Sequence, residues 1–215
     1  MRPEIRYIVL AAAITILFQH DRIEGFFETD PRVCHRVKAG SYPQISLEGV
    51  LDARTCAEII KDSEAHALTV GWETKRHDNY PTTDIDTANI PTLVYPVHNI
   101  VYRKIIPKMA KAFDLNPLKL GIGEVFVAKY EAERGKQRSL AAHTDGSDFS
   151  FVVALNDGFE GGGTKFVKSK RVERPVVGSG VGFCGQSRHQ GLAVTSGTRY
   201  ILAGFLKYEK PEGCE

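Results

Sequence analysis

The sequence predicts an α+β domain that is mainly β, a β-barrel or double-sheet jelly roll with helices packed on one side. Two observations carry this prediction. The first half of the chain has helical patterns, whereas the second half has short segments rich in β-branched and aromatic residues. The 215 residues, 42% hydrophobic and 25% charged, have the composition of one globular domain with a sizeable core.

Two predicted helices come first. Residues 52–68 have apolar side chains at helical spacing, and Asp52 is a candidate N-cap. Residues 98–113 form the second predicted helix, in which Pro107 indicates a kink or a break because proline has no N–H to donate. Between them, residues 71–96 are rich in Asp, Asn, Thr and Pro and predict a long loop, which in a compact domain is usually functional or disordered.

The strands are predicted in the second half of the chain. Turn sequences such as Asn156-Asp157-Gly158 and the glycine triplet 161–163 separate them. Short strands at regular spacing after helices are typical of a barrel or a jelly roll. The predicted strands are residues 123–130, 149–155, 164–168, 176–184 and 198–208.

The N-terminal segment differs from the rest of the chain. Arg2 and Arg6 precede an apolar run from Tyr7 to Phe18, which is shorter than the roughly 20 residues of a bilayer span but fits a signal peptide or signal-anchor. No small-residue cleavage site follows, so retention as a single-pass membrane anchor is favoured over cleavage. The alternative interpretation is that this apolar run forms a buried strand or helix of the domain.

The chain is therefore expected to have three parts. A signal-anchor or signal peptide is predicted over residues 1–22, a linker over 23–48 and a folded domain over 49–210. Such an N-terminus predicts localisation to the endoplasmic reticulum or elsewhere in the secretory pathway.

Charge and cysteine content argue against several classes of protein. The formal net charge of +2 gives no global field that would attract nucleic acid. The four cysteines show no C-x-x-C spacing, so a zinc ribbon or thioredoxin-like fold has no support. They could form up to two disulfides in an oxidising compartment, although Cys184 lies in an apolar stretch and is predicted to be a small buried hydrophobe.

A short basic run predicts either a solvated strand edge or a contact surface for an acidic substrate. Its residues are Lys165, Lys168, Lys170, Arg171 and Arg174.

Three polar residues near the predicted strands could bind one metal ion. His143 and Asp145 are two positions apart just before a strand, and such positions of an extended chain point to the same face. His189, after the strand 176–184, is placed to supply a third ligand. Two histidines and one carboxylate on one face leave three positions open, as in the facial triad of non-haem Fe(II) oxygenases. Zinc sites are more often closed by four protein ligands or keep one position open for water.

Arg199 strengthens this interpretation. Alternation along the strand 198–208 places it on the same face as three apolar residues. A guanidinium among apolar side chains is costly unless it meets an anion, and a dicarboxylate cosubstrate supplies one through a bidentate contact. The alternative is an arginine on a solvated face or paired with a local Glu. The apolar residues of that face are Ile201, Ala203 and Phe205.

The segment from Phe126 to Phe205 resembles the C-terminal catalytic domain of procollagen lysyl hydroxylases, within the wider prolyl 4-hydroxylase-like 2-oxoglutarate oxygenases. The resemblance extends over roughly residues 70–208, and it implies a double-stranded β-helix (jelly-roll) fold and an Fe(II)/2-oxoglutarate dioxygenase domain over 49–210. The matching motifs are GW at Gly71-Trp72, NYPTTDID, FVAKY, AAHTDGSDFSFVVALN, FEGGGTKF, the region of His189 and SGTRYILAGF.

By this resemblance, His143, Asp145 and His189 match the iron ligands, and Arg199 matches the residue that anchors 2-oxoglutarate. Prolyl 4-hydroxylases usually have Lys at the position of Arg199, so the arginine favours the lysyl branch of the family.

Four further residues are candidates for the walls of the site. Tyr130 matches a position that often lines the cosubstrate pocket, and its alternative is an ordinary tyrosine of the barrel core. Thr164, just past the glycine triplet, is a second candidate for that pocket. Trp72 and His77 lie in the predicted long loop, where they could form a lid over the substrate.

The resemblance implies a dioxygenase that uses Fe(II), 2-oxoglutarate and O2, with L-ascorbate as a further cofactor. Such an enzyme hydroxylates prolyl or lysyl residues of a protein or peptide and releases succinate and CO2. The alternatives are a 2-oxoglutarate oxygenase for a small molecule and a catalytically silent binding module. The chain has no counterpart of the glycosyltransferase domains of long lysyl hydroxylases, and a charged loop that departs from the family pattern follows Tyr130, so the substrate stays open.

Overall fold

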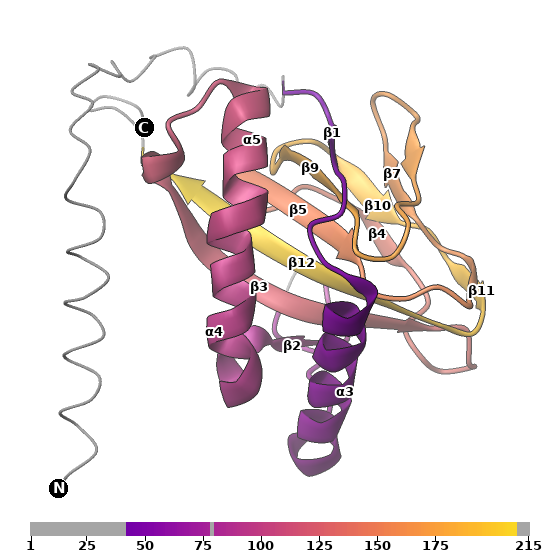
Figure 1. Cartoon of the computed structure of the whole chain (residues 1–215). Coiled ribbons are helices and arrows are strands. Elements are labelled where there is room, and N and C mark those ends of the chain that lie inside the picture. The colour runs from indigo at the N-terminus through magenta and orange to yellow at the C-terminus, as the bar shows by residue number, and fades with distance from the viewer. Residues whose placement is uncertain (1–41, 78–79, 210–215) are drawn as a thin grey trace, which may run out of the picture.

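The structure is a computed structural model that describes residues 42–77 and 80–209 (Figure 1). Two antiparallel sheets form the body of the domain, and helices cover one face of the larger sheet. The predicted fold, mainly β with helices on one side, is confirmed. Residues 1–22, most of the predicted linker, Cys34 and Cys214 lie outside the described residues.

The larger sheet has six strands in the order β1-β9-β5-β12-β3-β2, and all neighbours are antiparallel. Two long strands, β3 (Leu120–Glu131) and β12 (Thr198–Tyr208), pair with each other along their lengths. The remaining strands are β1 (Ile45–Leu47), β2 (Asp84–Asp86), β5 (Phe149–Ala154) and β9 (Gly180–Cys184).

The smaller sheet has four strands in the order β4-β10-β7-β8 and lies behind the larger sheet in Figure 1. A separate two-stranded ribbon is formed by β6 and β11. The bounds are β4 (Leu140–His143), β6 (Glu160–Gly161), β7 (Thr164–Phe166), β8 (Val172–Glu173), β10 (His189–Gly191) and β11 (Val194–Ser196).

The first predicted helix is confirmed as α3 (Ala53–Val70). Asp52 caps it, because its carboxylate accepts the backbone N–H of Thr55 at 2.7 Å. The helix ends at Gly71, whose φ of 85° lies in the region that favours glycine.

The second helical region begins earlier than predicted. It consists of α4 (Pro91–Ile100), a π-helical turn (Val101–Ile105) and α5 (Ile106–Phe113). The prediction of a break at Pro107 is confirmed, because the π turn lies directly before it and accommodates a residue that lacks an N–H.

The prediction of one long loop over residues 71–96 is wrong for its second half. Strand β2, a 3-10 turn (Thr87–Asn89) and the first turns of α4 occupy residues 84–96. Pro91 stands at the first helical position, where its missing N–H costs nothing. Of the prolines that predicted a loop, Pro91 marks the start of a helix and Pro96 lies inside it. A second 3-10 turn (Pro117–Lys119) leads into β3.

The two faces of β3 and β12 belong to different cores, and this alternation positions the cavity. Alternate side chains pack against the helices on one face. The intervening side chains point between the two sheets and form a second cluster that contains no helix residue. Val125, Val127 and Leu202 belong to the helix side, and Phe126, Ala128, Ile201 and Ala203 belong to the space between the sheets.

The start of the sheet differs from the predicted linker over residues 23–48. Strand β1 lies inside that segment and pairs with β9, and Leu47 is fully buried. A strand this short has too few alternating residues to be recognised from sequence. Cys184 is fully buried, as predicted. None of the helices in the described part of the chain combines the length and apolar character needed to cross a membrane.

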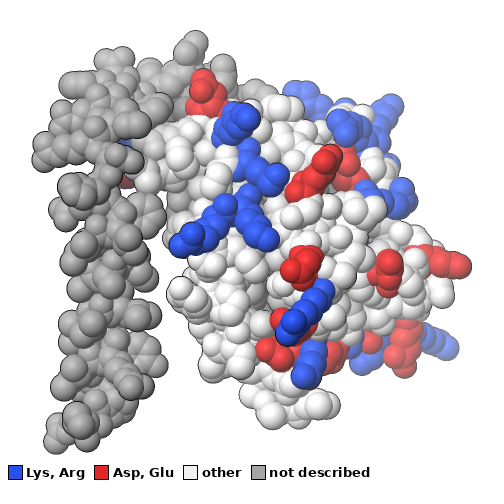
Figure 2. Space-filling view, viewed as in Figure 1, with Lys and Arg blue, Asp and Glu red and all other residues white. Residues whose placement is uncertain are grey.

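Basic side chains lie on the outside of the domain. Figure 2 shows Lys and Arg gathered over α5 on the helical face, where Lys104, Lys108 and Lys111 are exposed. The basic run predicted as a strand edge or contact surface is also exposed at Lys168 and Lys170, around the β7–β8 hairpin.

Candidate metal centre and cavity

Two histidines meet because their strands are paired. His143 ends β4, His189 begins β10, and the two residues lie directly opposite each other in the antiparallel ladder. Opposite residues of such a ladder have side chains on the same face, about 5 Å apart at Cβ. The centroids of the two imidazole rings are 4.4 Å apart.

Asp145 completes the cluster. Its backbone N–H donates to the carbonyl of Gly185 at 2.8 Å. Its Oδ1 lies 3.3 Å from Nε2 of His143 and 3.8 Å from Nε2 of His189. One ligand atom from each of the three residues lies within 4.8 Å of the others, and all three residues are buried. This donor set fits a divalent ion such as Fe(II), with several coordination positions left open.

Backbone carbonyls fix the orientation of both rings. Nδ1 of His143 donates to the carbonyl of Ala141 at 2.8 Å, and Nδ1 of His189 donates to the carbonyl of Ser187 at 2.9 Å. Because a carbonyl can only accept, Nδ1 carries the hydrogen in each ring. The Nε2 lone pairs are then free for a metal, and metal-binding histidines usually donate the other ring N–H to a carbonyl or carboxylate in this way.

Burial and the contacts among His143, Asp145 and His189 shift the pKa values of these three residues in opposite directions. Burial lowers the pKa of His189 below its ordinary value. Burial also acts to lower the pKa of His143, but its contacts with Asp145 and a backbone carbonyl outweigh burial and raise the pKa. For Asp145, burial acts to raise the pKa, whereas the two histidines and Ser150 lower it to a net value below the ordinary one. The carboxylate is thereby held ionised, as a metal ligand must be.

A pair of buried serines orients Asp145. The hydroxyl of Ser150 donates to Oδ2 of Asp145 at 2.5 Å, and the hydroxyls of Ser147 and Ser150 lie 2.8 Å apart. Because Ser150 occupies Oδ2, Oδ1 faces the two histidines. Gly185 permits this packing, since a Cβ there would lie 2.2 Å from the carbonyl of Ser147.

A cavity of about 550 Å³ opens beside the three ligands and extends between the sheets. Arg199 lines it and is only 4% exposed. Tyr130 lies opposite Arg199 in the β3–β12 ladder, with its ring centroid 5.7 Å from the guanidinium carbon. Thr164, at the start of β7, also lines the cavity.

The guanidinium of Arg199 has no ion pair or hydrogen bond with any residue that the structure describes. Burial lowers its pKa, but arginine stays charged at neutral pH. A buried charge without a protein partner is unfavourable, so this end of the cavity is suited to an anionic ligand.

The glycine triplet at 161–163 lets the backbone approach Arg199. All three residues have positive φ, and a Cβ on Gly162 would lie 3.0 Å from Cδ of Arg199. A segment predicted only as a turn therefore also packs against Arg199 in the wall of the cavity.

The cavity brings together the six residues proposed from the sequence, and it is also lined by His77. Trp72, the other candidate for a lid, lies elsewhere, 6.3 Å from the ring of Tyr200, and its indole N–H is 3.4 Å from Glu64. The apolar residues predicted beside Arg199 also line the cavity, at Ile201, Ala203 and Phe205. Ser150 was not predicted, because the sequence does not show how the turn before β5 directs its hydroxyl to Asp145, five residues earlier. The six are Tyr130, His143, Asp145, Thr164, His189 and Arg199.

Sequence comparisons find relatives among procollagen lysyl hydroxylases. The chain is 33% identical over 178 residues to procollagen-lysine,2-oxoglutarate 5-dioxygenase 2 of Mus musculus, covering 76% of this chain and 24% of that protein. It is 30% identical over 177 residues to the multifunctional procollagen lysine hydroxylase and glycosyltransferase of Caenorhabditis elegans, covering 73% and 23%. The chain thus spans about a quarter of the length of these curated relatives. No family model matches it.

Solved structures share the fold. A viral collagen prolyl hydroxylase from Paramecium Bursaria Chlorella virus-1 superposes with a TM-score of 0.60 at 19% identity, covering 81% of this chain and 99% of that one. A Pseudomonas putida prolyl-4-hydroxylase gives a TM-score of 0.59 at 16% identity, covering 83% and 98%.

The fold and the ligand set together define a class, the double-stranded β-helix proteins with two histidines and one carboxylate for a non-haem iron. The chain belongs to the 2-oxoglutarate- and Fe(II)-dependent dioxygenases, and within them it is related to the catalytic domain of procollagen lysyl hydroxylases. It shares its fold with prolyl 4-hydroxylases.

Proposed function

We propose that this domain hydroxylates lysyl or prolyl residues of a protein, with Fe(II), 2-oxoglutarate and O2. The reaction couples decarboxylation of 2-oxoglutarate to succinate and CO2 with insertion of one oxygen atom into a substrate C–H bond. The names of the relatives support a protein substrate, because they specify procollagen lysine.

The observation that carries the proposal is the unpaired, buried Arg199 in the same cavity as the three metal ligands. A metal site alone fits many reactions. A metal site that shares a cavity with a buried guanidinium is suited to a cosubstrate that chelates at one end and carries a carboxylate at the other. 2-Oxoglutarate has this form.

The residues have distinct roles in this proposal. Nε2 of His143, Oδ1 of Asp145 and Nε2 of His189 hold the iron, which supplies O2 activation when bound. Arg199 binds the distal carboxylate of 2-oxoglutarate through its planar fork. Tyr130 and Thr164 line the cosubstrate end, and the apolar side chains of β12 keep water away from the reacting atoms. L-Ascorbate is proposed as an additional cofactor by likeness to the family, and the prediction is that it prolongs turnover.

A small-molecule oxygenase is the second candidate. The cavity of about 550 Å³ lies within the usual range of small-molecule sites. The epimerase SnoN from nogalamycin biosynthesis shares the fold, with a TM-score of 0.59 at 16% identity, so the fold serves such chemistry as well.

Two measurements test these proposals. Succinate production that requires both Fe(II) and 2-oxoglutarate tests the enzyme class, and its absence would favour a silent binding module. A library of lysine- and proline-containing peptides, followed by mass spectrometry for products heavier by one oxygen atom, tests the substrate class. Succinate production without any modified peptide would favour the small-molecule oxygenase.

We also infer that the protein enters the secretory pathway, on the basis of the apolar run from Tyr7 to Phe18. The segment lies outside the described residues. Expression of a chain that begins at Gly25 tests this inference, because it should be active while no longer being directed to membranes. A truncated chain that fails to fold would assign the segment to the domain instead.

A further inference from the structure

The cavity extends beyond the residues assigned to iron and 2-oxoglutarate. Arg199 and Phe205 both line it from the same face of β12. At about 3.3 Å per residue, their separation along the strand is about 20 Å. The part of the cavity beside Phe205 is therefore remote from Arg199 and is available to the primary substrate.

His77 is a polar residue in this remote wall. Its ring centroid lies 5.2 Å from that of Phe126 and 6.0 Å from that of Phe205. Its Nε2 is buried, has no hydrogen-bond partner among the described residues, and lies 3.6 Å from Oδ2 of Asp84. Burying a polar imidazole nitrogen between aromatic rings costs free energy, unless a ligand or a neighbouring charge replaces the interactions with water that the nitrogen loses.

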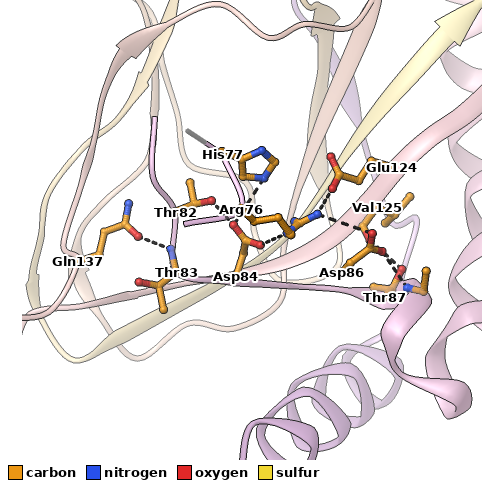
Figure 3. Close-up of polar contacts among 11 residues, drawn as sticks. Arg76, His77, Thr82, Thr83, Asp84, Asp86, Thr87, Glu124, Val125 and Gln137 are labelled. Atoms are coloured by element: carbon orange, nitrogen blue, oxygen red, sulfur yellow. Dashed lines mark hydrogen bonds and ion pairs between the residues drawn. The ribbon is translucent and has the colours of Figure 1, made fainter. Parts of the chain in front are cut away.

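Asp84, behind the ring, is held from several sides (Figure 3). Its fully buried carboxylate accepts from Nε of Arg76 at 2.6 Å and from the hydroxyl of Thr82. Asp84 and Glu73 also exchange backbone hydrogen bonds of 3.0 and 3.1 Å. These contacts hold the segment that carries His77 against the edge of the larger sheet.

Arg76 connects this network to two more carboxylates (Figure 3). Its Nη1 pairs with Glu124 and lies 3.7 Å from Oδ2 of Asp86. One arginine thus faces three carboxylates. The excess negative charge behind His77 favours a substrate group that donates a hydrogen bond over one that accepts it.

We propose that His77 is a specificity-determining residue that binds the primary substrate, and that Asp84 and Arg76 are positioning residues that hold its ring. The inference rests on the proposed function and names part of its substrate site. It assigns to the substrate an N–H or O–H donor that meets His77 in the cavity.

The protonation of His77 supports this assignment. Burial lowers the pKa of His77, and although Asp84 opposes that effect, the net pKa is below the ordinary value. The ring is therefore neutral near pH 7. If its single N–H points from Nε2 toward Asp84, Nδ1 is left as a hydrogen-bond acceptor for the substrate.

The test uses the full chain and a peptide that the wild-type protein hydroxylates. His77→Phe keeps a ring but removes hydrogen bonding, and it should raise the KM for the peptide by roughly three- to tenfold, the effect of one hydrogen bond. His77→Gln, which can still accept, should be intermediate. His98→Gln makes the same change on α4, outside the cavity, and should leave the KM unaltered.

Two readouts separate this role from a structural one. The KM for 2-oxoglutarate and the affinity for Fe(II), measured without peptide, should be unchanged in His77→Phe. Asp84→Asn should also raise the KM for the peptide, because the ring of His77 is then no longer held in position. An unchanged peptide KM in His77→Phe, or equal losses for peptide and 2-oxoglutarate, would overturn the inference. If the wild-type protein modifies no peptide, the proposed function fails first, and the inference fails with it.

Discussion

Two adjacent residue pairs of the β3–β12 ladder differ in how their charges are satisfied. Lys129 lies opposite Tyr200 on the side that faces α3, and Tyr130 lies opposite Arg199 on the side that faces the cavity. The ammonium of Lys129 is 3.0 Å from a carboxylate oxygen of Glu64. Arg199 has no such partner in the described part of the chain.

This contrast distinguishes a charge satisfied within the fold, at Lys129, from the charge of Arg199, for which we propose a ligand. On the helix side, Glu64 also accepts from the hydroxyl of Tyr200, so the charges and polar groups satisfy one another and join α3 to the sheet. On the cavity side, the guanidinium of Arg199 is buried without a charged partner among the described residues, which is why we propose that it binds a ligand. Residues one position apart on a strand can thus have opposite roles, because alternation sends them to different environments.

The largest expected effect comes from the metal ligands on the cavity side. His143→Ala, Asp145→Ala and His189→Ala should each abolish iron-dependent succinate production, because two ligands hold the ion poorly. Metal content and succinate yield measure this effect. Near-wild-type turnover with full iron occupancy in any one variant would remove that residue from the site.

Arg199→Ala should have the next largest effect. Loss of a desolvated, bidentate contact should cost about 2–5 kcal/mol of 2-oxoglutarate binding, which is more than tenfold in affinity. Fe(II) binding should change little, because the three ligands remain. Arg199→Lys should be intermediate, since a point charge replaces the fork.

The measurement for Arg199 is an anaerobic titration of the Fe(II)-loaded protein with 2-oxoglutarate. Wild-type affinity in Arg199→Ala would show that the anchor lies elsewhere and that the two ends of the cavity are wrongly assigned.

Ser150→Ala should weaken metal binding by about 10-fold, at the lower end of the usual range for residues that orient metal ligands. The reason is that Oδ2 of Asp145 loses its hydrogen bond and the carboxylate can rotate away from the histidines. Calorimetry with Mn(II) measures this without turnover. Ser150→Thr keeps the hydroxyl and is the matched control, and equal affinities for Ala and Thr would argue against the role.

The smallest expected effect lies on the helix side. Lys129→Met should lower the free energy of unfolding by about 1 kcal/mol, the scale of a partly exposed ion pair, without changing 2-oxoglutarate affinity. Denaturant unfolding and the same anaerobic titration measure the two quantities. A loss of 2-oxoglutarate affinity in Lys129→Met would show that the helix side also contributes to cosubstrate binding, against the proposed division of roles between the two faces.

The pH dependence of stability sharpens this last prediction. Burial acts to raise the pKa of Glu64, but Tyr200 and Lys129 outweigh it, and the folded pKa is below the ordinary value of 4.5. The stabilisation is therefore present above pH 4.5 and is lost as pH falls through the lowered pKa. Lys129→Met should lose less stability than the wild-type protein on acidification.

The sequence alone predicted the class of the domain and most of the candidate metal site. The spacing of His143 and Asp145, the place of His189 after a strand and the alternation around Arg199 follow from local geometry, because a strand repeats every two residues. The same local rules located α3 with its cap, and the break at Pro107. They failed at residues 84–96, where Pro91 opens a helix and Pro96 lies inside it instead of marking a loop.

Only the tertiary structure decided which distant groups meet. The pairing of β4 with β10 places His143 opposite His189. Whether a charge such as Lys129 or Arg199 has a partner depends on contacts between residues far apart in the chain. Such contacts leave no local pattern, because they are set by how whole strands and helices pack.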